Sequence, residues 1–176
     1  MDDLLSVNLS QFTGLILYFH SQVISTTALD TFESFVSGGG GVLAIHSATA
    51  SFKKIDRYFD ILGGKFVGHG PVQRLEITPC SQDNEIFQDK DPFIVKDELY
   101  VHELCSDICV HFCSELDGRK VPVVWTHQYE KGRVCYACPG HRCPALRVLP
   151  YRNILLQGLH WACGIPTNAP RDKELE

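Results

Sequence analysis

The stretch GGGGVLAIHSAT at residues 38–49 most constrains what this chain can fold into. Its glycines lead into a four-residue apolar run, residues 42–45, which is typical of a strand covered on both faces of a sheet. His46 and Ser47 follow this run directly. Because ligands of open parallel sheets bind outside the carboxyl ends of the strands, we expect a binding site at this turn.

Extended and helical patterns alternate along the rest of the chain. Helices are expected to begin near Thr27, to follow Ser51 and to close the chain at 151–163. Further strands are expected at 12–19, 72–77, 122–127 and 133–138. This alternation predicts an α/β fold with a mostly parallel sheet and helices on both faces. One domain is expected at 1–165, followed by a loose tail at 166–176.

The composition argues against several classes of partner. The 176 residues are 44% apolar, which is enough for one sizeable hydrophobic core. The net charge of −5 comes without a basic run, which argues against nucleic acid as the partner. No apolar stretch approaches the roughly 20 residues of a membrane-spanning helix, and the start, MDDLL, is acidic where a signal peptide is basic. We therefore expect a cytoplasmic protein that contacts neither nucleic acid nor membranes.

The eight cysteines are expected to stay reduced and to pack as small apolar residues, as in an intracellular protein. Cys135 and Cys138 lie in a predicted strand and would fill core positions. Zinc bound by this Cys-x-x-Cys with Cys143 and His141 is the alternative, although a second Cys-x-x-Cys is missing. A four-residue spacing would align three further cysteines on one helix face: Cys105, Cys109 and Cys113.

Five stretches together resemble one known family. The chain is similar to the ThuA-like (trehalose utilisation) family, a branch of the class I glutamine-amidotransferase-like superfamily, from about Phe12 to Cys163. The matching stretches, in family order, are GGGGVLAIHSAT at 38–49, ILGGKFVGHGPVQ at 61–73, DELY at 97–100, VVWTHQYEKGRVCYACPGH at 123–141 and LLQGLHWA at 155–162.

The resemblance implies a flavodoxin-like, three-layer fold that lacks the family's first strand. Family members begin with a strand and loop before the counterpart of 12–19, where this chain has only residues 1–11. That strand would lie centrally, between 12–19 and 42–45. An empty slot would leave backbone groups unpaired, so the neighbours must close up or another segment or chain must fill it. A homodimer is one way to fill it.

Two histidines are expected to be catalytic. His46 stands where glutamine amidotransferases carry their nucleophilic cysteine, so we do not expect glutaminase activity. Imidazole carries protons near neutral pH, which suits His46 to general acid–base catalysis. His141 follows a predicted strand in Pro139-Gly140-His141, and the family match points to the same role.

Six further residues are expected to bind substrate. Glu98 and Tyr100 share one side of an extended segment, because their spacing is two. The glycines around His69 permit close backbone approach. The sequence around Ser47 is not Gly-x-Ser-x-Gly, so a serine hydrolase is not expected. The full predicted binding set is His20, Ser47, His69, Glu98, Tyr100 and His127, whereas the histidines interpreted as structural are His102, His111 and His160.

The family resemblance implies a function in carbohydrate metabolism. ThuA-like proteins are associated with the use of trehalose and related disaccharides through 3-keto sugars, so we expect a hydrolase or lyase acting on a keto-glycoside or disaccharide derivative. A carbonyl at C3 acidifies the C2 proton, and elimination at C1 then needs only a base and an acid. Two alternatives stay open: a repurposed isomerase or lyase of specialised metabolism, and a non-catalytic ligand-binding or scaffold protein.

No cofactor is expected, and no metal ligand is assigned. Several imidazoles and a carboxylate near one crevice would nevertheless suit a divalent metal. The sequence contains no His-x-His or His-x-x-x-His spacing, so such ligands would have to meet through the fold alone.

Overall fold

The computed structural model describes residues 1–80, 85–88, 90–105 and 107–166. Within these ranges the α-helices are α1 (Thr26–Ser37), α2 (Asp56–Leu62) and α3 (Leu149–Cys163). The strands are β1 (Gly14–Leu17), β2 (Gly41–Ile45), β3 (Gly64–His69), β4 (Gln73–Pro79), β5 (Phe93–Asp97), β6 (Tyr100–Leu104), β7 (Cys109–Leu116), β8 (Arg119–Tyr129) and β9 (Gly132–Ala137).

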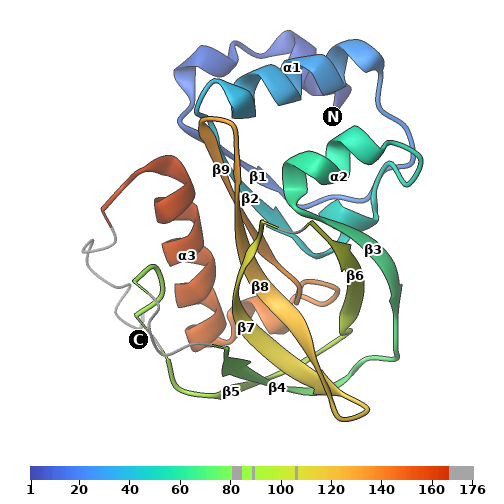
Figure 1. Cartoon of the computed structure of the whole chain (residues 1–176), viewed down its shortest axis with the longest axis vertical. Helices are drawn as coiled ribbons and strands as arrows, with labels where there is room; N and C mark the ends of the chain where they lie inside the picture. Colours follow the sequence, from blue (N-terminus) through green and yellow to red (C-terminus); the bar gives the residue numbers. More distant parts are fainter. Residues whose placement is uncertain (81–84, 89, 106, 167–176) are drawn as a thin grey trace.

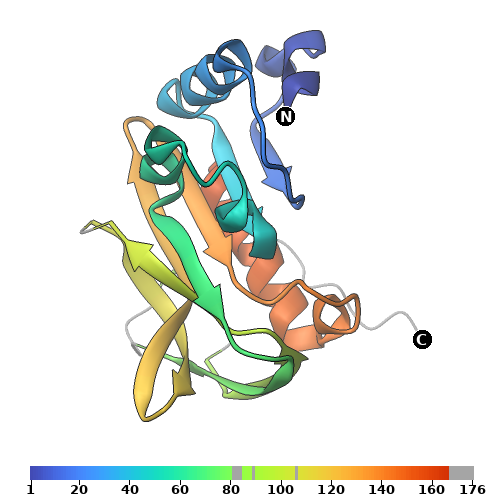
Figure 2. The ribbon, with the colours of Figure 1, turned by 90° about the vertical axis from the view of Figure 1, so that its right-hand side faces the viewer.

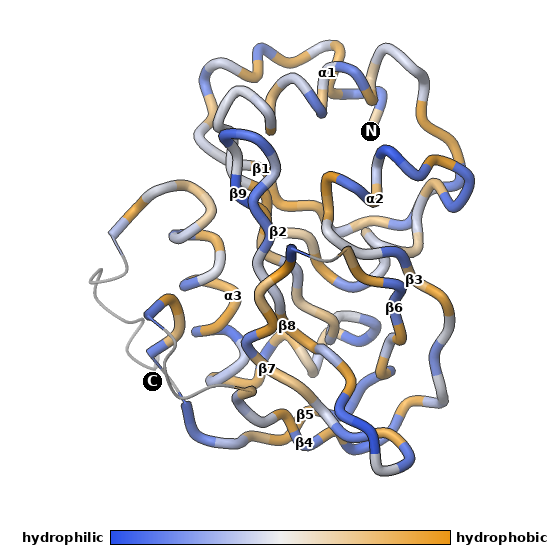
Figure 3. Tube along the Cα trace, viewed as in Figure 1, coloured by the Kyte–Doolittle hydropathy of each residue, from blue (hydrophilic) through white to orange (hydrophobic). Residues whose placement is uncertain are grey.

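Seven strands form one curved sheet in the order β1-β2-β9-β8-β7-β4-β5, and β3 pairs with β6 in a smaller sheet (Figure 1). Parallel pairing is confined to β1, β2 and β9, and the remaining pairs are antiparallel. The α/β, broadly flavodoxin-like fold is therefore confirmed, but the sheet is mixed rather than mostly parallel. The sheet is mixed because β7, β8 and β9 are joined by short turns, and strands joined by a short turn must run antiparallel. These turns are hydrophilic (Figure 3).

The helices cover both faces of the parallel part of the sheet (Figure 2). α3 packs against β2 and β9 from one side, and α1 packs on β9 from the other. Contacts are close enough to require glycine: a Cβ on Gly132 would lie 2.1 Å from the carbonyl oxygen of Val36 in α1. All five residues of β2 are buried, which confirms the strand predicted at 42–45. The three predicted layers are thus present, with β2 in the middle one.

β1 lies at the edge of the sheet and pairs directly with β2, from Gly14 opposite Gly41 to Leu17 opposite Ala44. The strands on either side of the expected central slot are therefore direct neighbours, and no row of backbone groups is left unpaired between them. β1 is shorter than the predicted strand at 12–19, and of its side chains Leu17 is buried whereas Ile16 is exposed. The homodimer remains a prediction, but an unfilled position in the sheet no longer supports it, because β1 pairs directly with β2.

The cysteine-containing segment 105–113 differs from the prediction. Cys109 and Cys113 lie on β7 rather than on a helix, because this segment is paired with β8. Cys113 forms a disulfide with Cys80, so the expectation that all thiols stay reduced is wrong. Disulfides are rare in the cytosol, so this bond weighs against the predicted cytoplasmic location. That location remains a prediction. Cys135 and Cys138 fill the core as expected, and burial raises the pKa of both thiols to about 12.

The described residues form this one layered unit. Apart from Pro166, the predicted tail at 166–176 lies outside them. None of the helices within the described ranges has the length and apolar character needed to cross a membrane.

Candidate active site

His46 begins the turn at the carboxyl end of β2, in the left-handed backbone region with φ of 50°. Its ring is buried, and its Nδ1 lies 2.8 Å from the carbonyl oxygen of Cys138. A carbonyl only accepts hydrogen bonds, so Nδ1 carries the proton and Nε2 of the neutral ring is left with a free lone pair. Burial lowers the pKa of His46, against the opposing effect of this hydrogen bond. The side chain is therefore a neutral base at pH 7.

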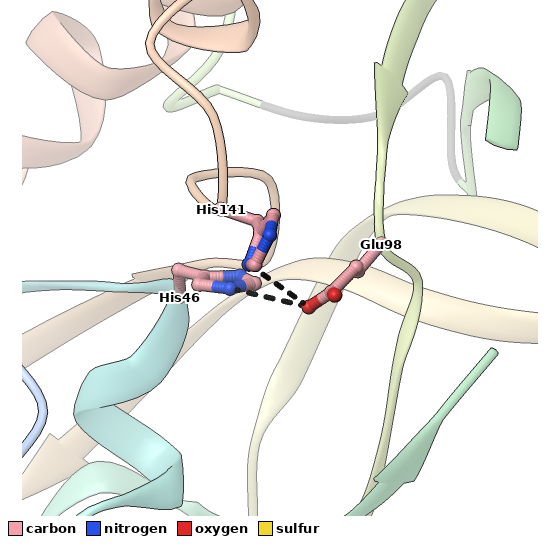
Figure 4. Close-up of side chains that lie close together, drawn as sticks. All are labelled: His46, Glu98 and His141. Atoms are coloured by element: carbon pink, nitrogen blue, oxygen red, sulfur yellow. Dashed lines mark ion pairs between the residues drawn. The ribbon is translucent and has the colours of Figure 1, made fainter. Parts of the chain in front are cut away.

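Glu98 lies between β5 and β6 and has three imidazoles around its carboxylate. Its Oε2 is 3.7 Å from Nε2 of His46 and 3.3 Å from Nδ1 of His141 (Figure 4). Its Oε1 is 3.6 Å from Nδ1 of His69. Four segments that are far apart in the sequence thus meet at one carboxylate that is almost completely buried.

Asp97 holds this arrangement in place, although it was not among the predicted site residues. Its carboxylate is fully buried and accepts backbone N–H groups of Glu98 at 2.7 Å, His141 at 3.2 Å and Arg142 at 3.4 Å. These hydrogen bonds join the turn that contains Glu98 to the loop that contains His141. The available signal was a second carboxylate directly before Glu98 in the DELY stretch.

Gly140 lets the loop after β9 approach His46. A Cβ at this position would lie 2.7 Å from Cβ of His46 and 3.0 Å from Cγ2 of Ile45, closer than packed atoms tolerate. The hydroxyl of Tyr18 donates to the carbonyl oxygen of Gly140 at 2.6 Å, which fixes the loop from the side of β1. The spacing of His46 and His141 thus depends on a residue without a side chain.

A cavity of about 460 Å³ opens over these groups. The ring centroid of Tyr100 lies 4.1 Å from that of His46, with the two rings tilted by 33°. Burial raises the pKa of Tyr100, so its phenol stays protonated. A larger cavity of about 780 Å³ lies between α1 and residues 8–13, away from the histidine cluster, so we place the site at the smaller one. Six predicted site residues line the smaller cavity: His20, His46, Ser47, His69, Tyr100 and His141.

The structure does not bring His127 to this cavity. Its Nε2 lies 3.0 Å from the carbonyl oxygen of Asp60 in α2, so the predicted place at the rim is wrong: this side of β8 faces α2. Ser47 lines the cavity, but its hydroxyl donates to the carbonyl oxygen of Phe19 at 3.0 Å. It is therefore held as part of the wall rather than as a free nucleophile.

The histidines interpreted as structural lie outside the cavity. Nε2 of His102 is 3.0 Å from the hydroxyl of Thr49, and burial lowers the pKa of His102 to about 3. Nε2 of His111 is 2.7 Å from the hydroxyl of Thr126, and burial lowers the pKa of His111 to about 4. His160 belongs to α3, which packs against β2 and β9 on the face of the sheet opposite α1.

One group within the described residues has the geometry of a metal site, and it contains no cysteine. One ligand atom each from His46, Glu98 and His141 lies within 4.8 Å of the other two. The alternative of zinc held by cysteines is not supported, because the sulfur of Cys138 is buried and accepts the N–H of Tyr100 at 3.3 Å.

Comparison with known proteins identifies the family. The model of the ThuA family, described as trehalose utilisation, matches residues 1–162. The chain belongs to the ThuA family. The match includes residues 1–11, ahead of the stretch in which the sequence alone shows the resemblance. No curated protein matches this ThuA chain.

Solved structures share the fold of this ThuA protein. A ThuA-like protein from Parabacteroides merdae aligns with a TM-score of 0.83 at 19% identity, over 93% of this chain and 75% of its own. One from Bacteroides uniformis aligns with a TM-score of 0.74 at 18% identity, over 88% and 70%. A β-galactosidase from Bacillus circulans sp. alkalophilus aligns with a TM-score of 0.67 at 15% identity, over 92% of this chain and 24% of its own. At such identities the likeness shows the fold alone.

Proposed function

We propose that this ThuA protein is an enzyme that acts on a keto-glycoside or a keto derivative of a disaccharide by histidine-based elimination or hydrolysis. The observation that carries the proposal is that His46 and His141 line one cavity and that both lie against the buried carboxylate of Glu98. The volume of about 460 Å³ suits a molecule of the size of a sugar derivative. Membership of a family described as trehalose utilisation supports a carbohydrate substrate.

The proposed reaction begins with removal of the proton at C2, next to a carbonyl at C3. Nε2 of His46 takes this proton, because its lone pair is free and the ring is neutral. The electron pair of the C–H bond forms a C1–C2 double bond, and the C1–O bond breaks. The departing oxygen takes a proton from His141, whose orientation Glu98 holds. Addition of water to the double bond turns the elimination into a net hydrolysis.

The remaining predicted residues would hold the sugar. His69 and Tyr100 lie side by side with ring centroids 5.5 Å apart, so they form one wall that can contact a sugar face and its hydroxyls. His20 and Ser47 line the same cavity. These roles follow from the positions of the side chains in the cavity.

Turnover of 3-keto-trehalose, followed by NMR in D₂O, tests the proposal. We expect release of glucose and exchange of the C2 proton. His46→Asn and His141→Gln should each lower turnover by about 10²- to 10⁴-fold, the usual contribution of general acid–base groups. His160→Gln on α3 is the matched control and should keep wild-type turnover.

The two alternatives have different signatures in the same experiment. Exchange at C2 without release of glucose would point to a repurposed isomerase. A rise in melting temperature with the keto sugar, but no exchange, would point to a ligand-binding or scaffold protein. Equal turnover of wild type and His46→Asn would contradict the assigned chemistry.

A further inference from the structure

Two hydrogen-bond acceptors face each other in the buried part of the site. Nε2 of His46 is 3.7 Å from Oε2 of Glu98, and the two side chains are only 4% and 10% exposed. Nδ1 of His46 is already committed to the carbonyl oxygen of Cys138. Neither facing atom of the neutral ring and the carboxylate has a proton to give, so a cation or a donor group between them would relieve their repulsion.

His141 completes a set of three ligand atoms. Its Nδ1 lies 3.3 Å from the same Oε2 of Glu98, and the three ligand atoms lie within 4.8 Å of one another. In a tetrahedral site with bonds of about 2.1 Å, ligand atoms are about 3.4 Å apart. Two of the three pairs lie close to this spacing, at 3.7 and 3.3 Å. The third pair lies within 4.8 Å, and the side chain of His141 is 48% exposed on a loop, which leaves it room to adjust.

The surroundings of the three residues match those of metal ligands. A histidine that binds a metal almost always donates its other N–H to a carbonyl or a carboxylate, as His46 does to Cys138. Asp97 accepts the backbone N–H groups of both Glu98 and His141, so the other two ligands are also oriented from behind. These hydrogen bonds support the metal site independently of the spacing of the ligand atoms.

We propose that His46, Glu98 and His141 bind one divalent transition-metal ion, with Zn²⁺ as the reference ion and an open coordination position toward the cavity. Two imidazoles and one carboxylate suit Zn²⁺ and its first-row neighbours better than Ca²⁺ or Mg²⁺, which prefer oxygen ligands. Three protein ligands on one side of the ion are the arrangement of catalytic rather than structural zinc sites.

This inference depends on the proposed function in one respect only: the keto sugar is the ligand expected at the open coordination position of the metal. A ketone and its neighbouring hydroxyl would chelate the ion through two oxygen atoms, and the ion would polarise the carbonyl. His46 and His141 then hold the metal instead of moving protons. His69 is the imidazole left to do so, because its Nδ1 lies 2.7 Å from the carbonyl oxygen of Gly70 and its Nε2 is the acceptor.

The test is the binding of Zn²⁺ and Co²⁺ to the full chain. Protein is stripped with a chelator, dialysed and titrated with ZnCl₂ by calorimetry, and CoCl₂ reports the ligand set through its visible spectrum. We expect one ion per chain and Co²⁺ bands without thiolate charge transfer. Glu98→Gln and His141→Ala should each weaken binding by about a hundredfold or more. Because His141 is half exposed, its variant keeps the test valid if Glu98→Gln does not fold.

Two control variants separate this site from other ligands on the surface. His160→Ala on α3 and Cys143→Ser, which removes an exposed thiol two residues from His141, should bind Zn²⁺ as the wild type does. The proposal is overturned by wild-type protein that binds less than one ion. It is equally overturned if Glu98→Gln and His141→Ala keep full affinity, or if Cys143→Ser loses it.

Turnover of 3-keto-trehalose by stripped and Zn²⁺-loaded protein keeps the two proposals apart. Stoichiometric Zn²⁺ binding without turnover supports the metal site and contradicts the proposed function. Turnover by a protein that binds no ion supports the function and contradicts the metal site. Turnover that is lost on stripping and restored by Zn²⁺ supports the metal site and the keto-sugar substrate, with His69 instead of His46 as the base.

Discussion

Asp97→Asn tests whether one buried carboxylate holds the site together. The asparagine oxygen can still accept from Glu98 and His141, but these bonds lose the contribution of the charge, about 1 kcal/mol each. The amide NH₂ of the asparagine would face the N–H of Arg142. Because both groups are donors, this hydrogen bond is lost, which costs a further ~1 kcal/mol of stability. The free energy of unfolding should therefore fall by about 3 kcal/mol.

Urea unfolding and thermal melting measure this loss directly. In a chain of this size about 3 kcal/mol corresponds to a melting temperature lower by roughly 6–12 °C. Hydrogen exchange should become faster at the amides of Glu98 and His141, which lose the charged acceptor. Asp3→Asn is the matched control, since it removes the same charge from an exposed position and should change stability by less than about 0.5 kcal/mol. An equally small change for Asp97→Asn would refute the assigned role.

Two further predictions concern packing and pH. Gly140→Ala should lower stability by about 1–3 kcal/mol and displace His46, seen as a shift of its ring NMR signals, whereas Gly68→Ala, whose Cβ meets nothing within 4 Å, should do neither. His111 has a folded pKa of about 4 against 6.5 when unfolded, so only the unfolded chain binds the proton between these values. Stability should therefore fall with pH below 6.5, by about 2 kcal/mol at pH 5, and His111→Asn should lack this part of the pH dependence in urea titrations; an unchanged profile would contradict the prediction.

The sequence predicted those elements whose signals are local. The apolar run after the glycines predicted β2, and the helix predicted to begin near Thr27 is α1, which starts at Thr26. The final helix, predicted at 151–163, runs from Leu149 to Cys163. The β7–β8 hairpin also had a local signal, because Asp117 and Gly118 both take positive φ in its turn, as Asp-Gly pairs do. That dipeptide was readable in the sequence and was overlooked.

Other features had no local signal to find. β3, β5 and β6 are defined by partners far along the chain, and their polar and apolar residues alternate too briefly to predict a strand. His127 and His141 both follow or end apolar runs, yet one ring faces α2 and the other faces Glu98. Which side a strand residue faces depends on the register and on what covers the sheet, and both are set by tertiary packing.

The amino-acid sequence by itself determined that this is a ThuA-family α/β chain with a histidine at the end of a fully buried strand. Motif order, apolar runs and glycine stops are written in neighbouring residues, so they can be recognised without a fold. Only the tertiary structure decided that His46, His69 and His141 share one carboxylate, and that Asp97 holds it. Such a cluster is built by contacts across tens of residues, whose geometry follows from sheet order and packing rather than from any local preference.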